Sequence, residues 1–257
     1  MIDKDFRRLF YEFKRISNTR WIKGVNNYTN SVGLTFESLL GKKTDSLIFP
    51  DYYGIEIKCS QRFSRFPVSL FSVSFDGSGL FEMDRLLKLY GVNDEKFTDR
   101  LQLQGFIYSK RYNKINNNYF RLNVSYEDER IYILIYDLDL NLIDDNTYIE
   151  FSTIKNKLEL KLSKLAMVYA SKKKIDNQLY FRYYLIAFYK LSSFDNFIKL
   201  LNDDFIRVSI IGRVSRSGNN IGKQRNKNIV FSISKDNLEL LFDKCYEYNY
   251  DLTNFNS

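Results

Sequence analysis

The chain contains no histidine, which removes a large part of the usual catalytic chemistry of proteins. Zinc sites with histidine ligands, Ser-His-Asp triads and nucleases with a catalytic histidine all need the missing side chain. The two cysteines, Cys59 and Cys245, lie far apart in the sequence and supply neither a disulfide framework nor a four-thiolate metal site. Carboxylates, lysines and tyrosines remain for chemistry near neutral pH, and carboxylates with water suit the hard cations Mg²⁺ and Mn²⁺.

Long apolar runs are also missing, and no window of the sequence approaches a membrane span. The first fifteen residues are charged and amphipathic and have no apolar signal-peptide region, so we expect a cytoplasmic protein in a reducing compartment. What the chain does have is 44% apolar residues, including 22 Phe and 20 Tyr, which is enough for a substantial core. Its formal charge of +8 favours a polyanionic partner.

The stretch from Val32 to Ser60 carries the densest chemical pattern of the chain. Its apolar spacing predicts a helix that begins near Ser31 and ends at Gly41, with Glu37 in the middle. A strand, a tight turn at residues 52–54 and a second strand are expected to follow.

Charged residues alternate with apolar ones on that second strand. Because side chains of a strand alternate with period two, Glu56 and Lys58 leave one face while Ile55 and Ile57 point into a core. The turn is expected to fold Asp51 back beside the two charges. Two carboxylates and an amine on rigid strands fit a divalent cation and an activated water that cut a phosphodiester. An ordinary ion pair on a strand is the competing interpretation, and it leaves Asp51 and Glu37 unexplained.

The remaining elements follow from periodicity and turn residues. Further helices are expected at 3–17, near 83–90, at about 154–162, at 193–201 and at 235–245. Strands are expected at about 68–75, in antiparallel hairpins between 101 and 151, at 205–212 and at 229–234. The sequence shows no internal repeat and no low-complexity linker.

Several basic segments are candidates for contact with DNA. Arg62 and Arg65 follow the charged strand and could neutralise a phosphate, although surface arginines without such a role are common. The loop at 213–228 is the most basic of the chain and contains the side-chain types that pair with base edges in a major groove. Its candidate residues are Arg213, Arg216, Lys223, Gln224, Arg225, Asn226 and Lys227.

Two other polar features have simpler interpretations. Asp137 and Asp139 resemble a metal pair, but acids at a strand end beside a turn are usually solvated, so we do not assign them as ligands. The run at 172–174 consists of three lysines in or before a turn, where it serves either as a solubilising tip or as a phosphate contact.

The segments at Gly33–Gly41 (GLTFESLLG) and Pro50–Lys58 (PDYYGIEIK), followed by an Arg/Ser-containing segment and SLFS, resemble the MvaI/BcnI family of type II restriction endonucleases. These enzymes are relatives of MutH within the PD-(D/E)xK nuclease superfamily. The later segments KLAMVYA and SFDNFIKLLNDDFIRVSI also resemble that family, so the similarity covers most of the chain.

The resemblance implies an α/β (α+β) fold with a mixed central sheet flanked by helices and a smaller DNA-recognition lobe, a two-lobed architecture like that of MutH. We expect the catalytic lobe at 1–100 with part of 101–190, and the recognition lobe at about 191–257 with strands from the middle segment. The resemblance implies a monomer that cuts the strands of duplex DNA one after the other with Mg²⁺, for which Mn²⁺ can substitute. It also implies a bacterial host and a cognate DNA methyltransferase.

Carried over by position, the resemblance makes Asp51 and Glu56 metal ligands, Lys58 the group that orients or deprotonates the attacking water, and Glu37 an auxiliary acid. The chain departs from the family before the last expected strand, where GKQRNKNIVFSI has no histidine. The recognised base sequence therefore does not transfer. Two alternatives remain open: a MutH-like nicking enzyme of mismatch repair, and a basic DNA-binding protein without turnover.

Overall fold

The structure is a computed structural model that describes residues 2–41, 50–76, 81–216, 220–225 and 228–251. The chain divides into two compact units. The first unit comprises residues 1–66, 159–192 and 239–257, and the second comprises 67–158 and 193–238. Both units are discontinuous in sequence, and the second is the larger.

The boundaries of the units fall differently from the expected lobes. Residues 67–100, which we grouped with the catalytic lobe, belong to the second unit, and residues 239–251, which we grouped with the recognition lobe, belong to the first.

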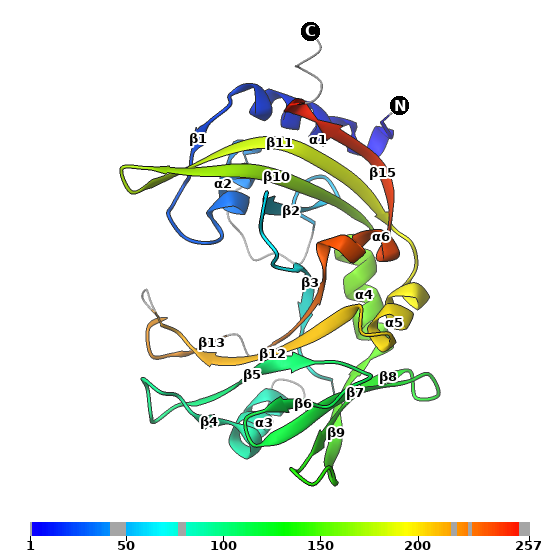
Figure 1. Cartoon of the computed structure of the whole chain (residues 1–257). Coiled ribbons are helices and arrows are strands. Elements are labelled where there is room, and N and C mark those ends of the chain that lie inside the picture. The colour runs from blue at the N-terminus through cyan, green and yellow to red at the C-terminus, as the bar shows by residue number, and fades with distance from the viewer. Residues whose placement is uncertain (1, 42–49, 77–80, 217–219, 226–227, 252–257) are drawn as a thin grey trace. The chain divides into compact units, whose positions relative to one another are not determined.

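The first unit is a mixed five-stranded sheet with helices packed on one face (Figure 1). Its strands run in the order β1-β11-β10-β2, and β15 pairs with β11. The pairing of β2 with β10 is parallel, whereas the other pairings are antiparallel. Its elements are α1 (Lys4–Asn18), β1 (Ile22–Lys23), α2 (Ser31–Leu39), β2 (Glu56–Gln61), β10 (Lys164–Ile175), β11 (Gln178–Leu191) and β15 (Phe242–Asn249).

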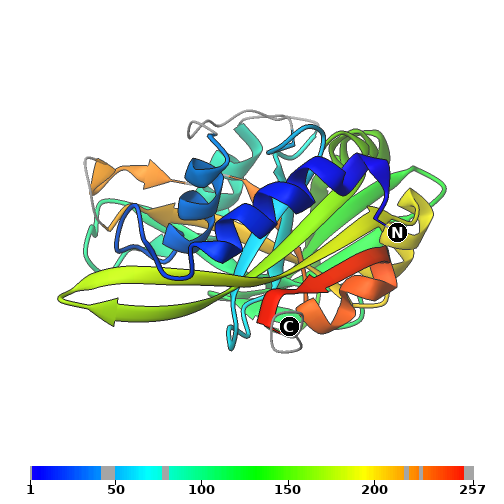
Figure 2. The same cartoon turned by 90° about the horizontal axis from the view of Figure 1, so that it is seen from above.

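Helix α1 lies across this sheet and closes its hydrophobic core (Figure 2). The helix forms because Phe6, Leu9, Phe13 and Ile16 recur every three or four residues, and all four are buried. Asp3 caps its first turn by accepting a hydrogen bond from the backbone N–H of Asp5. These apolar side chains pack onto residues of β10 and β11, so the helix covers one face of the sheet.

The second unit contains two antiparallel sheets. One has the strand order β3-β14-β12-β5-β4 with β13 paired to β12, and the other has the order β6-β7-β8-β9. Its strands are β3 (Val68–Val73), β4 (Val92–Asn93), β5 (Leu101–Ile107), β6 (Asn113–Ile115), β7 (Asn118–Ser125), β8 (Arg130–Tyr136), β9 (Leu142–Glu150), β12 (Ile206–Val214), β13 (Gln224–Arg225) and β14 (Ile229–Ile233). Its helices are α3 (Glu82–Tyr90) and α5 (Phe194–Asn202), while α4 (Phe151–Leu162) and α6 (Leu238–Leu241) span the unit boundary.

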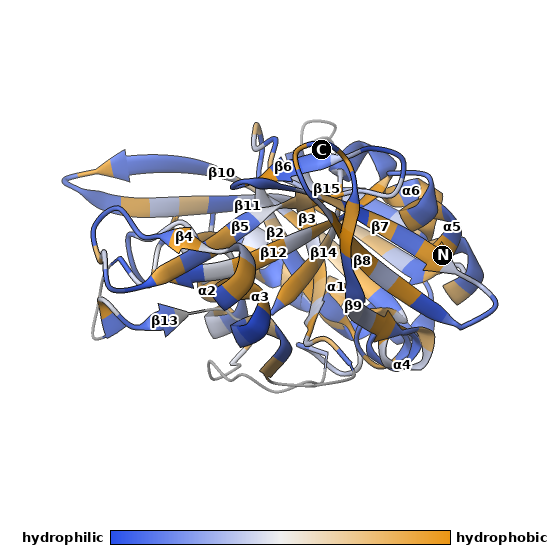
Figure 3. Ribbon diagram, turned by 90° about the horizontal axis from the view of Figure 1, so that it is seen from below, coloured by the Kyte–Doolittle hydropathy of each residue, from blue (hydrophilic) through white to orange (hydrophobic). Residues whose placement is uncertain are grey.

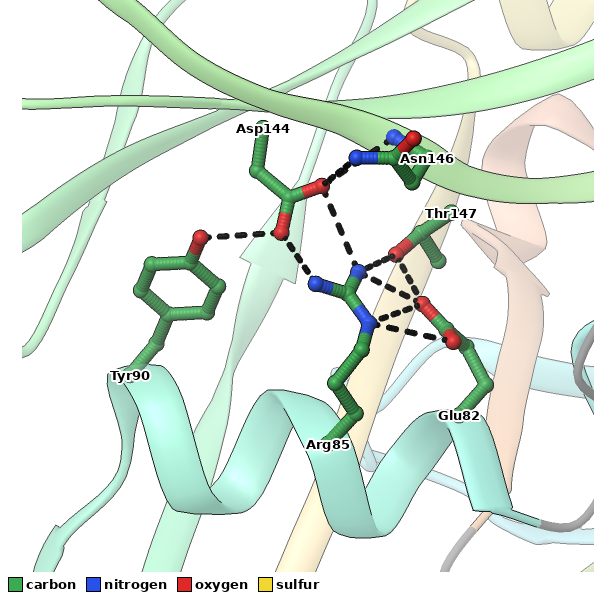
Figure 4. A network of polar contacts seen from close by, with 6 residues as sticks. All are labelled: Glu82, Arg85, Tyr90, Asp144, Asn146 and Thr147. Carbon is green, nitrogen blue, oxygen red and sulfur yellow. Dashed lines mark hydrogen bonds and ion pairs between the residues drawn. The ribbon is translucent and has the colours of Figure 1, made fainter.

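A polar network anchors α3 to β9 in the second unit (Figure 4). Arg85 donates hydrogen bonds to the carboxylates of Glu82 and Asp144 and to the hydroxyl of Thr147. Tyr90 donates a further hydrogen bond to Asp144. Both carboxylates are buried, so the guanidinium supplies the positive charge that their burial requires.

Most of the expected elements are confirmed, with one error at the end of the chain. The helix expected at 235–245 is a 3₁₀ turn η3 (Lys235–Asn237) and the four-residue α6, after which the chain continues as β15. The strand forms because Phe242 pairs with Leu191 of β11, while Tyr246 and Tyr248 pack edge-on against Phe10. Tertiary contacts therefore override the helical spacing of the leucines.

Three smaller predictions also have outcomes. Gly41 follows α2 with a φ of 76°, the left-handed geometry that favours glycine after a helix. Asp137 caps a turn by accepting hydrogen bonds from Asp139 and Asn141, which agrees with the solvated interpretation. The strand expected before the turn at 52–54 falls within 42–49, outside the described residues. Cys59 and Cys245 are both free, and no helix in the described ranges is long and apolar enough to cross a bilayer.

Candidate active site

Glu56 and Lys58 leave β2 on the same face, as their alternation predicts. Lys58 Nζ lies 2.6 Å from Glu56 Oε1, while the intervening Ile57 and the preceding Ile55 are buried in the core. The Glu56 side chain is 2% exposed and that of Lys58 is 26% exposed. The carboxylate of Glu56 is therefore buried, whereas the side chain of Lys58 is partly exposed to solvent.

A tight turn places Asp51 beside this pair. Tyr52 and Ile55 exchange both backbone hydrogen bonds, and Tyr53 and Gly54 have φ values of 47° and 80°. Two successive positive φ values are typical of a type I′ turn, which reverses the chain in two residues. The carboxylate of Asp51 then accepts a hydrogen bond of 3.0 Å from the backbone N–H of Ile57. The expected return of Asp51 toward β2 is confirmed.

Glu37 approaches the same strand from α2. A Cβ atom added at Gly33 would lie 3.6 Å from Glu37 Oε1 and 4.0 Å from Cys59 Cβ, so the helix acid and β2 are close neighbours. Desolvation, followed by the negative charges of Glu37 and Asp51, raises the pKa of the Cys59 thiol well above its usual range. The thiol is therefore neutral at physiological pH, and Glu37 and Asp51 both lie close enough to Cys59 of β2 to act on its charge.

Lys161 also lies at this site, although no pattern in the neighbouring sequence predicts it. It belongs to the last turn of α4, and its Nζ lies 3.5 Å from Glu56 Oε1 with a quarter of its side chain exposed. The contact depends on the parallel pairing in which Glu56 lies opposite Leu165 of β10. Only this non-local pairing brings residue 161 to residue 56, so periodicity and spacing do not reveal it.

The environment of Glu56 disfavours the charged form of its carboxylate. Burial raises the pKa of Glu56, and the nearby negative charge of Asp51 raises it further, while Lys58 and Lys161 oppose that change. Oε1 has its lysine partners, whereas Oε2 is buried and has no hydrogen-bond partner among the residues that the structure describes. An unsatisfied carboxylate oxygen of this kind is unusual in a folded protein.

These residues fit a hard divalent cation. The donors are carboxylate oxygens, which suit Mg²⁺, and Glu56 Oε2 is an orphaned acceptor that a cation would satisfy. In the described parts of the chain, no group of three or more Asp, Glu or Cys side chains is arranged as a complete metal cage. Mg²⁺ needs none, because it is usually bound through one or two carboxylates together with water and substrate phosphates.

Comparison with known proteins identifies the family of the chain. The sequence profile of the MvaI/BcnI restriction endonuclease family matches residues 10–242. The chain belongs to this family. The expected resemblance is thereby confirmed, and the chain is a restriction endonuclease, an enzyme that cuts DNA at specific sites.

Solved structures support the fold. The complex of restriction endonuclease MvaI with its cognate DNA substrate is 22% identical, with a TM-score of 0.88 over 95% of this chain and 98% of that one. MvaI in the absence of DNA is 22% identical over the same shares, with a TM-score of 0.58. A search of curated protein sequences finds no match.

The candidate DNA contacts of this family member fall in both units. In the first unit, Arg62 and Arg65 are exposed and follow β2 directly. In the second unit, Arg213 and Lys223 are exposed, and the side-chain amide of Gln224 donates a hydrogen bond to the Arg213 carbonyl.

The other candidates of the basic loop are either paired within the protein or lie outside the described residues. Arg216 forms a two-pronged pair with the buried Asp94, with both N···O distances at 2.7 Å. Arg225 pairs with Arg213 across β12 and β13, and Asn226 and Lys227 are not among the described residues.

Proposed function

We propose that this restriction endonuclease hydrolyses duplex DNA with Mg²⁺ bound at Asp51 and Glu56. The observation that carries the proposal is the buried, unpartnered Oε2 of Glu56 beside a lysine and a second acid. A bound Mg²⁺ would neutralise charge that develops on the scissile phosphate and lower the pKa of a coordinated water. Mn²⁺, which shares this preference for oxygen ligands, is expected to substitute.

Each residue has a distinct proposed role. Asp51 is held in place by the N–H of Ile57, and Glu56 by burial, so both carboxylates have fixed positions. Lys58 orients the attacking water, because its ammonium already lies at the carboxylate that binds the cation. To deprotonate that water, Lys58 must first release its own proton to solvent, and a bound cation nearby favours the neutral amine. Glu37 is the auxiliary acid of the site.

Lys161 has a supporting role in this proposal. When Lys58 turns from Glu56 toward the water, the second ammonium still faces Glu56 Oε1 and limits the cost of its buried charge. Arg62 and Arg65 are proposed to contact phosphates next to the cut.

We further propose that the second unit carries base recognition. Its candidates are Arg213, Arg216, Lys223, Gln224, Arg225, Asn226 and Lys227. Of these, Arg216 must leave Asp94 before it can pair with a base, which makes it the costliest candidate. Arg225→Ala is expected to relax site choice, and fragments of unchanged size and specificity would remove Arg225 from the recognition set.

The enzyme is proposed to act as a monomer in the bacterial cytoplasm and to cut the two strands in turn. A cognate methyltransferase is proposed to protect the host DNA. Sequential cutting predicts that nicked circles accumulate before linear DNA appears from a supercoiled plasmid. A mass near 30.7 kDa in light scattering without DNA, and that mass plus the mass of one duplex with DNA, is the expected result for a monomer.

The deciding experiment compares the wild type with Lys58→Ala on supercoiled plasmid, with and without Mg²⁺. Lys155→Ala is the matched control, because Lys155 is an exposed lysine of α4. Discrete fragments that need Mg²⁺, retained in the control and lost in Lys58→Ala, support the proposal. Nicks that appear only with repair proteins would favour the mismatch-repair alternative, and binding without cleavage would favour the inactive binder.

A further inference from the structure

The first unit has a second polar surface on the sheet face turned away from its hydrophobic core. Strand register places Lys23 of β1, Tyr180 of β11 and Lys173 of β10 side by side across three strands. Their neighbours Ile22 and Phe181 face the core on the opposite side, so the alternation of each strand sends these three side chains outward. The half of β10 next to its hairpin turn with β11 is coloured mostly hydrophilic in Figure 3.

Aromatic rings hold one of these lysines in place. Lys173 Nζ lies 4.3 Å from the centre of the Trp21 ring and 6.0 Å from that of Tyr180. Such cation–π contacts favour the charged ammonium and restrict its motion. A cation that is already positioned loses less conformational entropy when it meets an anion.

A bulge extends the same surface toward β2. Tyr169 pairs with Leu185 and Ala170 pairs with Tyr183, which makes Tyr184 the extra residue of β11. The guanidinium of Arg62 lies 5.8 Å from the Tyr184 ring. Arg62 also donates its backbone N–H to the carbonyl of Ala170, which fixes it at the end of β2.

This surface, which we call the basic face (Trp21, Lys23, Arg62, Lys173, Tyr180 and Tyr184), begins at the candidate active site. Lys58 pairs with Met167 of β10, and Lys173 follows Met167 by an even number of residues on the same face. At about 3.3 Å per residue, Lys173 is about 20 Å from Met167 along the strand. That is the rise of about six base pairs of duplex DNA.

The cations of the basic face are available for an external anion. No described carboxylate forms an ion pair with Lys23, Arg62 or Lys173. Arg182, which lies between them on β11, is by contrast paired with Asp251. Cations that form no ion pair complement the phosphates of a DNA backbone, which carry no sequence information, rather than base edges.

We propose that the basic face binds the phosphate backbone of the DNA flanking the cut site, without regard to base sequence. The inference rests on the proposed nuclease function and extends it. The face adds affinity and fixes the direction in which the duplex leaves the active site, and base recognition remains with other residues.

The test measures DNA affinity by fluorescence anisotropy in Ca²⁺, between about 50 and 200 mM salt. The variant Lys23→Gln/Lys173→Gln removes two charges from the basic face. The matched control Lys172→Gln/Lys174→Gln removes two charges from the same hairpin, but its residues pair with Phe181 and Leu179 on the opposite face. We expect the slope of log K against log salt to become shallower by about 1.8 in the first variant and to stay unchanged in the control.

Equal slopes for the two double variants would overturn the proposal. A second readout is available because Trp21 is the only tryptophan of the chain, so its emission reports on this face. Emission is expected to change on DNA binding, and DNA that binds without any such change would also overturn the proposal. Plasmid cleavage by the wild type with Mg²⁺ is scored separately, so failure of the nuclease function is distinguished from failure of the basic face.

Discussion

Replacing Asp144 by Asn tests how the polar network of the second unit stabilises the fold. The Asp144 carboxylate accepts hydrogen bonds from Arg85, Tyr90 and Asn146. Burial alone raises the pKa of Asp144, but these donors outweigh it and lower the pKa from 3.8 to about 2. An Asn side chain carries no negative charge. Its NH₂ group is a hydrogen-bond donor and would face other donors, with which it cannot form a hydrogen bond.

The expected loss follows from that pKa. A fall from 3.8 to about 2 corresponds to about 2.4 kcal/mol at 1.36 kcal/mol per pKa unit. Because the folded-state pKa is the lower one, this stabilisation is present above about pH 4 and is lost as the pH falls toward 2. At pH 7, Asp144→Asn should therefore increase the unfolding equilibrium constant of the second unit about 50-fold.

Hydrogen exchange provides the assay, because it reports on the second unit alone. Peptides that cover α3 and β9 should lose about 50-fold in protection at pH 7 in Asp144→Asn. Asp145→Asn is the matched control, because Asp145 is the exposed neighbour on β9, and it should leave protection unchanged. Equal effects of the two variants would refute the reasoning, and so would a loss of stability between pH 4 and 2 that is as large in Asp144→Asn as in the wild type.

Three further predictions concern the candidate site of the first unit and the packing within the second unit. Lys161→Met should slow plasmid cleavage about fivefold, the equivalent of about 1 kcal/mol for a partly exposed ion pair with Glu56, and Lys161→Arg should restore the rate in the same assay. Asp51→Ala should abolish cleavage while DNA binding in Ca²⁺, measured by anisotropy, is largely retained, and unchanged cutting would remove Asp51 from the site. Gly105→Ala should destabilise the fold by about 1–3 kcal/mol in urea unfolding, because the new Cβ would lie 2.5 Å from Ile115 Cγ1, and an added Ile115→Val exchange should not make the loss larger.

The central site could be predicted from the sequence because its parts are local. Strand alternation places Glu56 and Lys58 together, and a two-residue turn returns Asp51 to them, all within eight residues. These relations depend on backbone geometry that short sequence patterns determine. The family resemblance then connected Glu37 to the same chemistry.

The features that were missed or misplaced depend on pairings between distant segments. Lys161 reaches Glu56 only because β10 lies parallel to β2, and β15 forms only because β11 offers an edge to Phe242. Each unit is likewise assembled from separate stretches of chain. Periodicity within one segment carries no information about which segment it will meet.

The parallel pairing of β2 with β10 also affects how the enzyme folds. Residues 62–163 separate the two strands, and closing a chain of roughly 100 residues costs about 4 kcal/mol of entropy before any contact is gained. The strands β6 to β9 each pair with their neighbour in the sequence, so these hairpins can form early. We therefore expect the catalytic strand to dock late, so that a refolding chain passes through compact species that cannot yet cut DNA.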